Sequence, residues 1–383
     1  MVLVVLAITS GDKGLWNAVR GRPALEESED AAEVGELCES RQGRWWSIVG
    51  PVPISEPSGW LTVPHDRTRI LDKSYAVGPL TVRPGGKRLV EYLALEPMAL
   101  EGTTCFESWP LLVEGAWDEG PEHISVPTPD ELRATQGRWI AGERKIARDV
   151  RRLSAILALV WNEPWQVRTA PKQSSQLAPE VPDSRHPPST WFDDDEYPEP
   201  HEETLPGWAV TAWDQIEQDQ NLGSALLSWH EGLLLTPAHP SFAHVAFMGA
   251  IEELSYSSAF VGAMPSPEAP CGACGLARSG HSQRFWAMVT QAASADQVTD
   301  LRKWEVTRKR GATAHGAGLH GIEEIYGSVI LLDFVPPPEG QKTGSFEFSP
   351  SDPVSHFMFK VLPAVRDIAR RLLLRALEGV SEG

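Results

Sequence analysis

The sequence predicts an α+β protein in which a β-rich amino-terminal part precedes a helical carboxyl-terminal part. Before about residue 125 the chain is dense in Pro, Gly and Trp, and short apolar segments alternate with turn signals, as is typical of strands. After about residue 206 apolar side chains recur at helical spacing instead. With 383 residues, 42% of them hydrophobic, the chain is long enough to bury the cores of two or three domains.

Three apolar segments of the amino-terminal part are predicted strands: Val2–Ile8, Trp45–Val49 and Arg88–Leu95. The first of them has no basic residue before it and no small-residue cleavage pattern after it. That pattern favours a first β-strand over a signal peptide. The Trp side chains of this part, among them Trp45 and Trp46, are expected in the core, although an exposed Trp would also offer a stacking surface to a ligand.

A long helix is predicted to close the amino-terminal part. Thr128 and Glu131 have the spacing of a capping box, with Pro129 at the first helical position. An apolar stripe from Ile146 to Val160 then continues to about Trp161 at helical spacing. Two glycines, at positions 137 and 142, are the places where this helix could break.

A Pro-rich acidic segment is predicted to divide the chain. Residues 171–206 hold eight prolines and the acidic run Asp193–Glu196, so the segment has little apolar surface to bury and is expected to be an exposed linker. We therefore predict a β-rich domain with its long closing helix over residues 1–170, a linker over residues 171–206 and a helical domain over residues 207–383. The ligand of the amino-terminal domain is not indicated by any motif.

The carboxyl-terminal domain is predicted to be a bundle of about five helices. Ser294 and Gln297 form a second capping box, and Asp352 followed by Pro353 marks another helix start. The predicted helices are Trp208–Leu235, Phe242–Val261, His281–Ala293, a helix from Ser294 to His315, and a final helix from Asp352 onward.

Charge and cysteine content limit the class of protein. The net charge of -18 argues against a surface that binds nucleic acid indiscriminately, so any nucleic-acid site must be local. Four cysteines in a chain of this length are too few for a disulfide framework, which favours a reducing compartment such as the cytoplasm. No run of about 18 apolar residues occurs, so no membrane partner is expected.

The segment Trp304–Gly316, WEVTRKRGATAHG, is the strongest candidate for a functional site. It sets Arg310, a permanent cation with a forked donor face, five positions before His315, which exchanges protons near neutral pH. Arg302, Lys303, Arg308 and Lys309 surround the pair with positive charge in an otherwise acidic chain. The arginine and histidine suit cleavage of a phosphodiester, and the four surrounding cations are candidate RNA-binding residues.

Two alternatives accompany this prediction. At about 100° per residue, Arg310 and His315 are about 140° apart on a helix, whereas Arg308 and His315 share a face, so either arginine could partner the histidine. His315 could also be a helix-terminal histidine that interacts with the helix dipole, with the basic run as a solvated face.

The carboxyl-terminal part resembles HEPN domains of the type called ApeA-like, over about residues 208–383. The resemblance is carried by the helix order, an IEEL segment at Ile251–Leu254, a CGACG loop, RFW on the third helix, and VTRKRGATAHG. In that family a segment L-Y-x-x-R-S-x-x-x-H-G closes the active helix. Val306 and Thr307 stand at its Leu-Tyr positions, Arg310 at its arginine and His315 at its histidine, while Gly311 replaces the polar residue.

The resemblance implies a metal-independent endoribonuclease that cuts RNA as a homodimer, with the two Arg-His pairs facing each other and no cofactor. Several such proteins are toxins or antiviral defence effectors. The resemblance also favours Arg310 over Arg308 as the partner of His315. Gly311 leaves a second hypothesis open, a non-catalytic HEPN module that dimerises or binds RNA or a nucleotide, with the amino-terminal domain as a sensor of an unknown trigger.

Further polar residues have simpler explanations. Cys271 and Cys274 have the spacing of a zinc half-site, with His281 and His320 as conceivable further ligands, but two free thiols at a helical hairpin are the alternative. Glu252 or Glu253 is expected to pair with a basic residue inside the bundle. The remaining histidines of the helical part are expected to be structural. These are His230, His239, His244 and His356.

Overall fold

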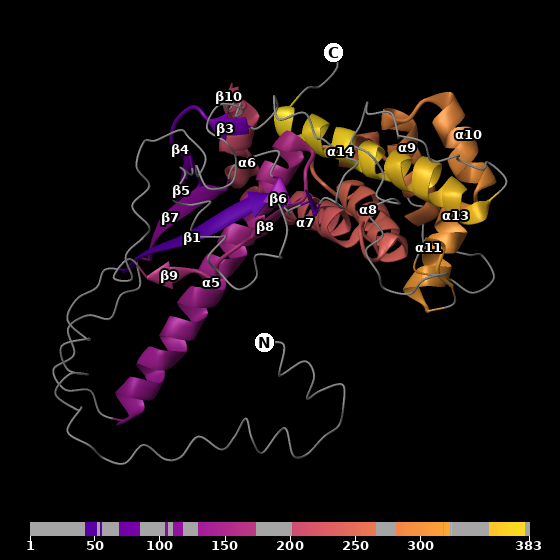
Figure 1. The fold of residues 1–383 in the computed structure, drawn as a ribbon. Helices are drawn as coiled ribbons and strands as arrows, with labels where there is room; N and C mark the ends of the chain where they lie inside the picture. The colour runs from indigo at the N-terminus through magenta and orange to yellow at the C-terminus, as the bar shows by residue number, and fades with distance from the viewer. Residues whose placement is uncertain are drawn as a thin grey trace. The chain divides into compact units, whose positions relative to one another are not determined.

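The computed structural model describes residues 43–51, 54–55, 69–84, 104–105, 110–117, 129–173, 201–265, 281–316, 318–321, 323 and 352–379. The chain divides into two compact units. The larger joins Gly43–Asp118 to Trp139–Gly383, and the smaller joins Met1–Gln42 to Glu119–Arg138. The packing described below belongs to the larger unit, which mixes helix and sheet as the α+β prediction expects (Figure 1).

An antiparallel sheet forms the β-rich part, with the strand order β4-β5-β7-β1-β8 and β9 paired to β1. Its strands are β1 (Gly43–Pro51), β4 (Tyr75–Val77), β5 (Leu80–Pro84), β7 (Leu111–Trp117), β8 (Trp165–Val167) and β9 (Lys172–Gln173). The strand predicted at Trp45–Val49 is confirmed as β1, and Trp45 and Trp46 are buried. The strands predicted at Val2–Ile8 and Arg88–Leu95 lie outside the described residues.

Two short strand pairs stand beside this sheet. Strand β2 (Ile54–Ser55) pairs with β6 (Thr104–Cys105), and β3 (Arg69–Leu71) pairs in parallel with β10 (His201–Glu203). Because β10 lies near the end of the predicted linker, just before the first helix of the carboxyl-terminal part, its pairing with β3 ties that end of the linker to the β-rich part. The side chain of Arg69 strengthens that tie through ion pairs with Glu163 at 3.0 Å and Glu203 at 3.3 Å.

Helix α5 (Pro129–Trp161) confirms the predicted closing helix from its first residue to its last. It continues through both glycines, so the possible break near residues 137 and 142 does not occur. On its inner face Val150, Leu153 and Leu157 are fully buried, and they share one hydrophobic core with Val49 and Val82 of the sheet. Burial of this stripe is the main force that holds the helix on the sheet.

The carboxyl-terminal helices number more than the sequence predicted, because three predicted helices are each divided, the final one among them. Trp208–Leu235 consists of two helices, and so does the segment from Ser294 to His315. The predicted helix Phe242–Val261 ends early, at Leu254, and a 3-10 turn η2 (Val261–Ala263) follows. The observed helices are α6 (Gly207–Gln218), α7 (Gln220–Leu235), α8 (Pro240–Leu254), α9 (His281–Ala292), α10 (Ala295–Lys303), α11 (Val306–Ala314), α13 (Pro353–His356) and α14 (Leu362–Glu378).

Asp219 is the reason that α6 and α7 are separate helices. Its backbone is extended, and its side chain accepts a hydrogen bond from the backbone N–H of Leu222, which caps α7. The second carboxylate oxygen accepts from the Ser257 hydroxyl at 2.8 Å and from the Ser258 N–H at 2.7 Å. A single carboxylate therefore caps one helix and fixes the turn that follows α8.

Replacing Asp219 by alanine is expected to destabilise the fold by about 2 kcal/mol, because the cap of α7 and the acceptor for Ser257 and Ser258 are lost together. The urea midpoint of unfolding measures the effect. Asp219→Asn is the matched control, since it retains a capping oxygen, and its loss should be smaller. An unchanged midpoint for the alanine variant would contradict this account of the break.

The final helix begins where the sequence predicted, with Asp352 accepting a hydrogen bond from the N–H of Ser355 at 2.8 Å. It is interrupted after one turn by a π-helical segment, η4 (Phe357–Val361), before α14. Pro363 supplies the physical reason. It has no N–H to donate to the carbonyl four residues earlier, and its ring displaces that carbonyl, so the helix widens locally.

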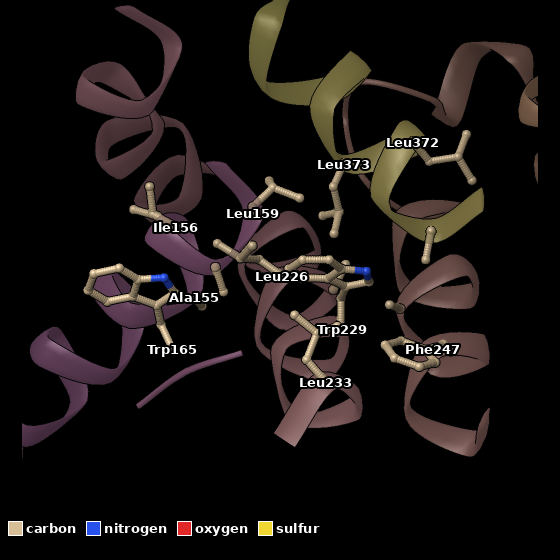
Figure 2. Close-up of a cluster of buried hydrophobic side chains, with 14 of the residues drawn as sticks. Ala155, Ile156, Leu159, Trp165, Leu226, Trp229, Leu233, Phe247, Leu372 and Leu373 are labelled. Carbon is tan, nitrogen blue, oxygen red and sulfur yellow. The ribbon is translucent and has the colours of Figure 1, made fainter. Parts of the chain in front are cut away.

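One hydrophobic core joins the sheet and α5 to the helices that follow. Figure 2 shows Leu159 and Trp165 beside Leu226, Trp229 and Leu233 of α7, with Leu372 and Leu373 of α14 on the other side. Polar contacts cross the same junction. The ring of His230 contacts the carbonyl of Trp165, and Arg370 donates to the carbonyl of Leu159 at 3.2 Å.

The predicted division into domains over residues 1–170 and 207–383 stays a prediction. A helical domain separated from the β-rich part would lose the core and the polar contacts that join α5 and β8 to α7 and α14. Most of the predicted linker, residues 174–200, lies outside the described residues. Among the helices that are described, none combines the length and apolar character needed to cross a membrane.

Candidate functional site

The sequence predicted that the candidate segment Trp304–Gly316 closes one long helix that begins at Ser294. This prediction is wrong, because two helices cover that stretch. The capping box is confirmed, because Ser294 accepts from the N–H of Gln297 and Gln297 accepts from the N–H of Ser294. Helix α10 then ends at Lys303, and α11 begins at Val306. Between them Glu305 has a φ of 58°, a left-handed conformation that is unfavourable for a residue with a side chain.

This break decides which side chains face the bundle. Trp304, just before it, is 8% exposed and stacks on Phe357 of η4 with ring centroids 5.2 Å apart. Val306, just after it, is fully buried. Since the chain turns at Glu305, both apolar residues enter the core while α11 changes direction. The tertiary packing of Trp304 and Val306 thus offsets the cost of the strained Glu305.

Arg310 lies on the side of α11 that faces α8. One terminal nitrogen of its guanidinium donates to the Glu252 carboxylate at 2.7 Å, and the two side chains are 32% and 23% exposed. The prediction that Glu252 or Glu253 pairs with a basic residue of the bundle is therefore confirmed for Glu252. The Nε of Arg310 is buried, and among the described residues it has no hydrogen-bond partner. The ion pair orients a guanidinium whose donors are not all engaged.

His315 is exposed and lies at the carboxyl end of α11. Its backbone N–H donates to the carbonyl of Gly311 at 3.1 Å. Gly316 follows with a φ of 71°, the left-handed conformation in which a glycine commonly ends a helix. Within the described residues, no hydrogen bond or ring contact joins His315 to Arg310.

The predicted RNA-binding cations are distributed over several contacts. Arg302 lies over the ring of Trp286 at 4.7 Å, and Lys309 lies over the ring of Trp304 at 3.8 Å. Arg308 forms an ion pair with Glu305 on the surface. Lys303 is exposed. Cation–π contacts hold two of these side chains on aromatic surfaces, so the positive charge is a set of anchored groups and not one continuous face.

His244 on α8, which the sequence predicted to be structural, also belongs to this region. It is fully buried, and its ring packs edge-on against Trp304 and Phe357. In the part of the chain that the structure describes, neither ring nitrogen has a hydrogen-bond partner. Burial lowers the pKa of His244 to about 3, and the positive charges of His320, Arg310 and Lys309 act in the same direction. His244 is therefore neutral, as a structural histidine.

The loop after α11 is attached to the first turn of α8. The hydroxyl of Ser241 accepts from the N–H groups of His320 and Gly321, at 2.7 and 3.0 Å. The Glu323 carboxylate in turn accepts from the N–H of Ser241 at 2.6 Å, which caps the amino end of α8. These contacts hold the end of α11 near α8, and with it the backbone that carries His315.

The predicted zinc site is not placed, because Cys271 and Cys274 lie outside the described residues. The side chain of His281 is likewise not described. His320, the other conceivable ligand, has its ring against Trp304 and its Nε2 3.3 Å from the carbonyl oxygen of Lys309. In the described part of the chain no three His, Cys, Asp or Glu side chains are grouped as a metal site requires.

Comparison of this chain with protein-family models, with curated proteins and with solved structures finds no match.

Proposed function

We propose that this chain is a metal-independent endoribonuclease of HEPN type that acts as a homodimer. The observation that carries the proposal is the arrangement of α11. Arg310 is oriented by Glu252 on its bundle side, while His315 is exposed at the end of the same helix. An oriented guanidinium and an accessible imidazole are the two groups that metal-free RNA cleavage requires.

The reaction follows from the chemistry of RNA. The ribose 2′-oxygen attacks the adjacent phosphorus, and the bond from phosphorus to the 5′-oxygen breaks. His315 accepts the proton of the 2′-hydroxyl, and an acid returns a proton to the leaving 5′-oxygen. Arg310 stabilises the negative charge that develops on the phosphoryl oxygens. One histidine per chain supplies only one of the two proton transfers, so the His315 of a second copy is the proposed acid.

Cleavage of RNA by the purified protein in excess EDTA tests the reaction. We expect activity to persist, because no step requires a divalent ion, and to disappear in the His315→Ala variant prepared in the same way. Activity that needs added metal and does not depend on His315 would contradict the proposal.

The homodimer is a separate prediction. A dimer that pairs the two copies of α11 should be visible by light scattering of the full chain at micromolar concentration, because the run Gly311–Gly318 contains few bulky side chains and allows close approach. A strictly monomeric protein would exclude the two-histidine arrangement. His315→Ala serves as the control, since it should leave the dimer intact.

The second candidate function is a non-catalytic module that dimerises or binds RNA or a nucleotide, with residues 1–170 as a sensor. Two observations favour it. Gly311 follows Arg310 where the resemblance expects a polar residue, and within the described residues Arg310 pairs with Glu252 while no hydrogen bond joins it to His315. RNA binding without cleavage by both wild type and His315→Ala would favour this function over the nuclease.

A further inference from the structure

Helix α5 has a basic face on its solvent side over residues 144–152, the two turns before the buried run that begins at Leu153. Arg144, Lys145, Arg148 and Arg151 are exposed, and Arg152 beside them is partly exposed. These five cations lie within nine residues of a chain whose net charge is -18. We call them the α5 basic face.

Helical geometry gathers these charges on one side. At about 100° per residue, Arg148 and Arg151 lie within about 40° of Arg144, and Arg152 and Lys145 extend the face to about 100°. The opposite side of the same turns holds Ile146, Val150 and other buried residues. A single acidic residue of these turns, Asp149, lies at the edge of the face, where it pairs with Lys145 at 3.5 Å.

Carboxylates on neighbouring helices neutralise only part of the face. Arg151 pairs with Glu231 of α7 at 2.6 Å, and Arg152 pairs with Glu217 of α6 at 3.3 Å. The Nε of Arg148 donates to the carbonyl of Arg144 one turn earlier. Within the described residues, neither Arg144 nor Arg148 has a carboxylate partner. Two like charges one turn apart repel each other, so this face lowers its energy when it binds an anion.

We propose that the α5 basic face binds the sugar-phosphate backbone of single-stranded RNA. The proposal rests on RNA as the substrate of the proposed nuclease and adds a second contact surface for it. The occupant follows from charge complementarity, since the exposed guanidinium groups match phosphate oxygens and, within the described residues, no ion pair must break at Arg144 or Arg148. Because the face belongs to α5 and the candidate catalytic pair to α11, its role is to hold RNA and not to cleave it.

Fluorescence anisotropy of a labelled 20-nucleotide oligouridylate tests this role. The full chain carries His315→Ala so that cleavage cannot interfere. Arg144→Glu with Arg148→Glu should weaken binding about tenfold, and the slope of log K against log salt should fall by about 1.4, since each lost phosphate contact contributes about 0.7 for a single strand. The charge-preserving pair Arg144→Lys with Arg148→Lys should bind nearly as tightly as the parent.

The matched control is Lys73→Glu with Arg371→Glu, which makes the same change in net charge at two exposed cations elsewhere. If the control weakens binding as much as the α5 variant, or if neither does, the α5 basic face does not bind RNA. Cleavage is assayed separately in the chain with His315 intact. If the chain binds RNA through this face but does not cleave it, the nuclease proposal alone is contradicted. If the chain cleaves RNA and the α5 variant binds it as tightly as the parent, this inference alone is contradicted.

Discussion

Replacing His315 by alanine is expected to reduce RNA cleavage by a factor on the order of 10² to 10⁴, the usual contribution of a general acid or base. Initial rates on a labelled single-stranded RNA in EDTA measure the effect. His315 is exposed at the end of α11, so its removal should leave the fold unchanged by far-UV circular dichroism. A variant that retains wild-type cleavage would remove His315 from the mechanism.

Arg310→Ala should have an effect of the same order, because the charge that stabilises the phosphoryl transition state is lost. The alanine variant also leaves the carboxylate of Glu252 without its arginine. Arg310→Lys therefore accompanies it, since it keeps the charge without the forked donor. Glu252→Gln tests the orientation of the arginine separately, and a smaller loss of activity is expected because Arg310 itself remains.

Arg308→Ala is the control variant, because on an ideal helix Arg308 shares a face with His315 and could replace Arg310 as its partner. Arg308 is exposed and bound to Glu305 next to it on the surface, so we expect activity within about twofold of wild type. If Arg308 proves essential and Arg310 dispensable, the site must be redrawn around the face that Arg308 shares with His315.

Gly311 provides the test if wild type proves inactive on every RNA. A Cβ placed on Gly311 would meet no atom within 4 Å, so the Cβ of Gly311→Ser has open space around it. It restores the polar residue that the resemblance expects after the arginine. Activity in Gly311→Ser alone would show that the site is built for cleavage but lacks one group.

Acid is expected to destabilise this protein strongly through His244. Its pKa is about 3 in the folded chain, against the ordinary 6.5 that applies after unfolding. The unfolded state thus binds the proton more readily than the folded state. The contribution of neutral His244 to the free energy of unfolding is therefore complete above pH 6.5 and is lost as the pH falls toward 3. The loss amounts to a free energy of unfolding on the order of 4 kcal/mol across that range.

Urea unfolding at several values of pH between about 7.5 and 4 measures this effect. His244→Phe should flatten the dependence on pH, because its ring suits the surrounding aromatic side chains and binds no proton. His230 is also buried with a lowered pKa, mainly through desolvation, so part of the dependence should remain. A His244→Phe variant as acid-sensitive as wild type would contradict the assignment.

Features of the fold that depend on neighbours in sequence were predictable. The start of α5 at Pro129, the capping box of Ser294 and Gln297, and the helix start at Asp352 each depend on residues within one turn, so the sequence contains all the information they need. Pairing of Glu252 with a basic residue also followed, since a carboxylate on an apolar helix needs a cation.

Features that depend on distant residues were not predictable. Helices α6 and α7 separate at Asp219 because Ser257 and Ser258, almost forty positions later, donate to the same carboxylate that caps α7. Helix α11 separates from α10 because burial of Trp304 and Val306 offsets the left-handed Glu305. The sequence by itself therefore determined the starts of α5, α10 and α13 and the α+β class, through caps and apolar periodicity that act within a turn. Only the tertiary structure decided where the helices break. It also decided that Arg310 faces Glu252 while His315 is exposed to solvent, because both features depend on packing between segments far apart in the chain.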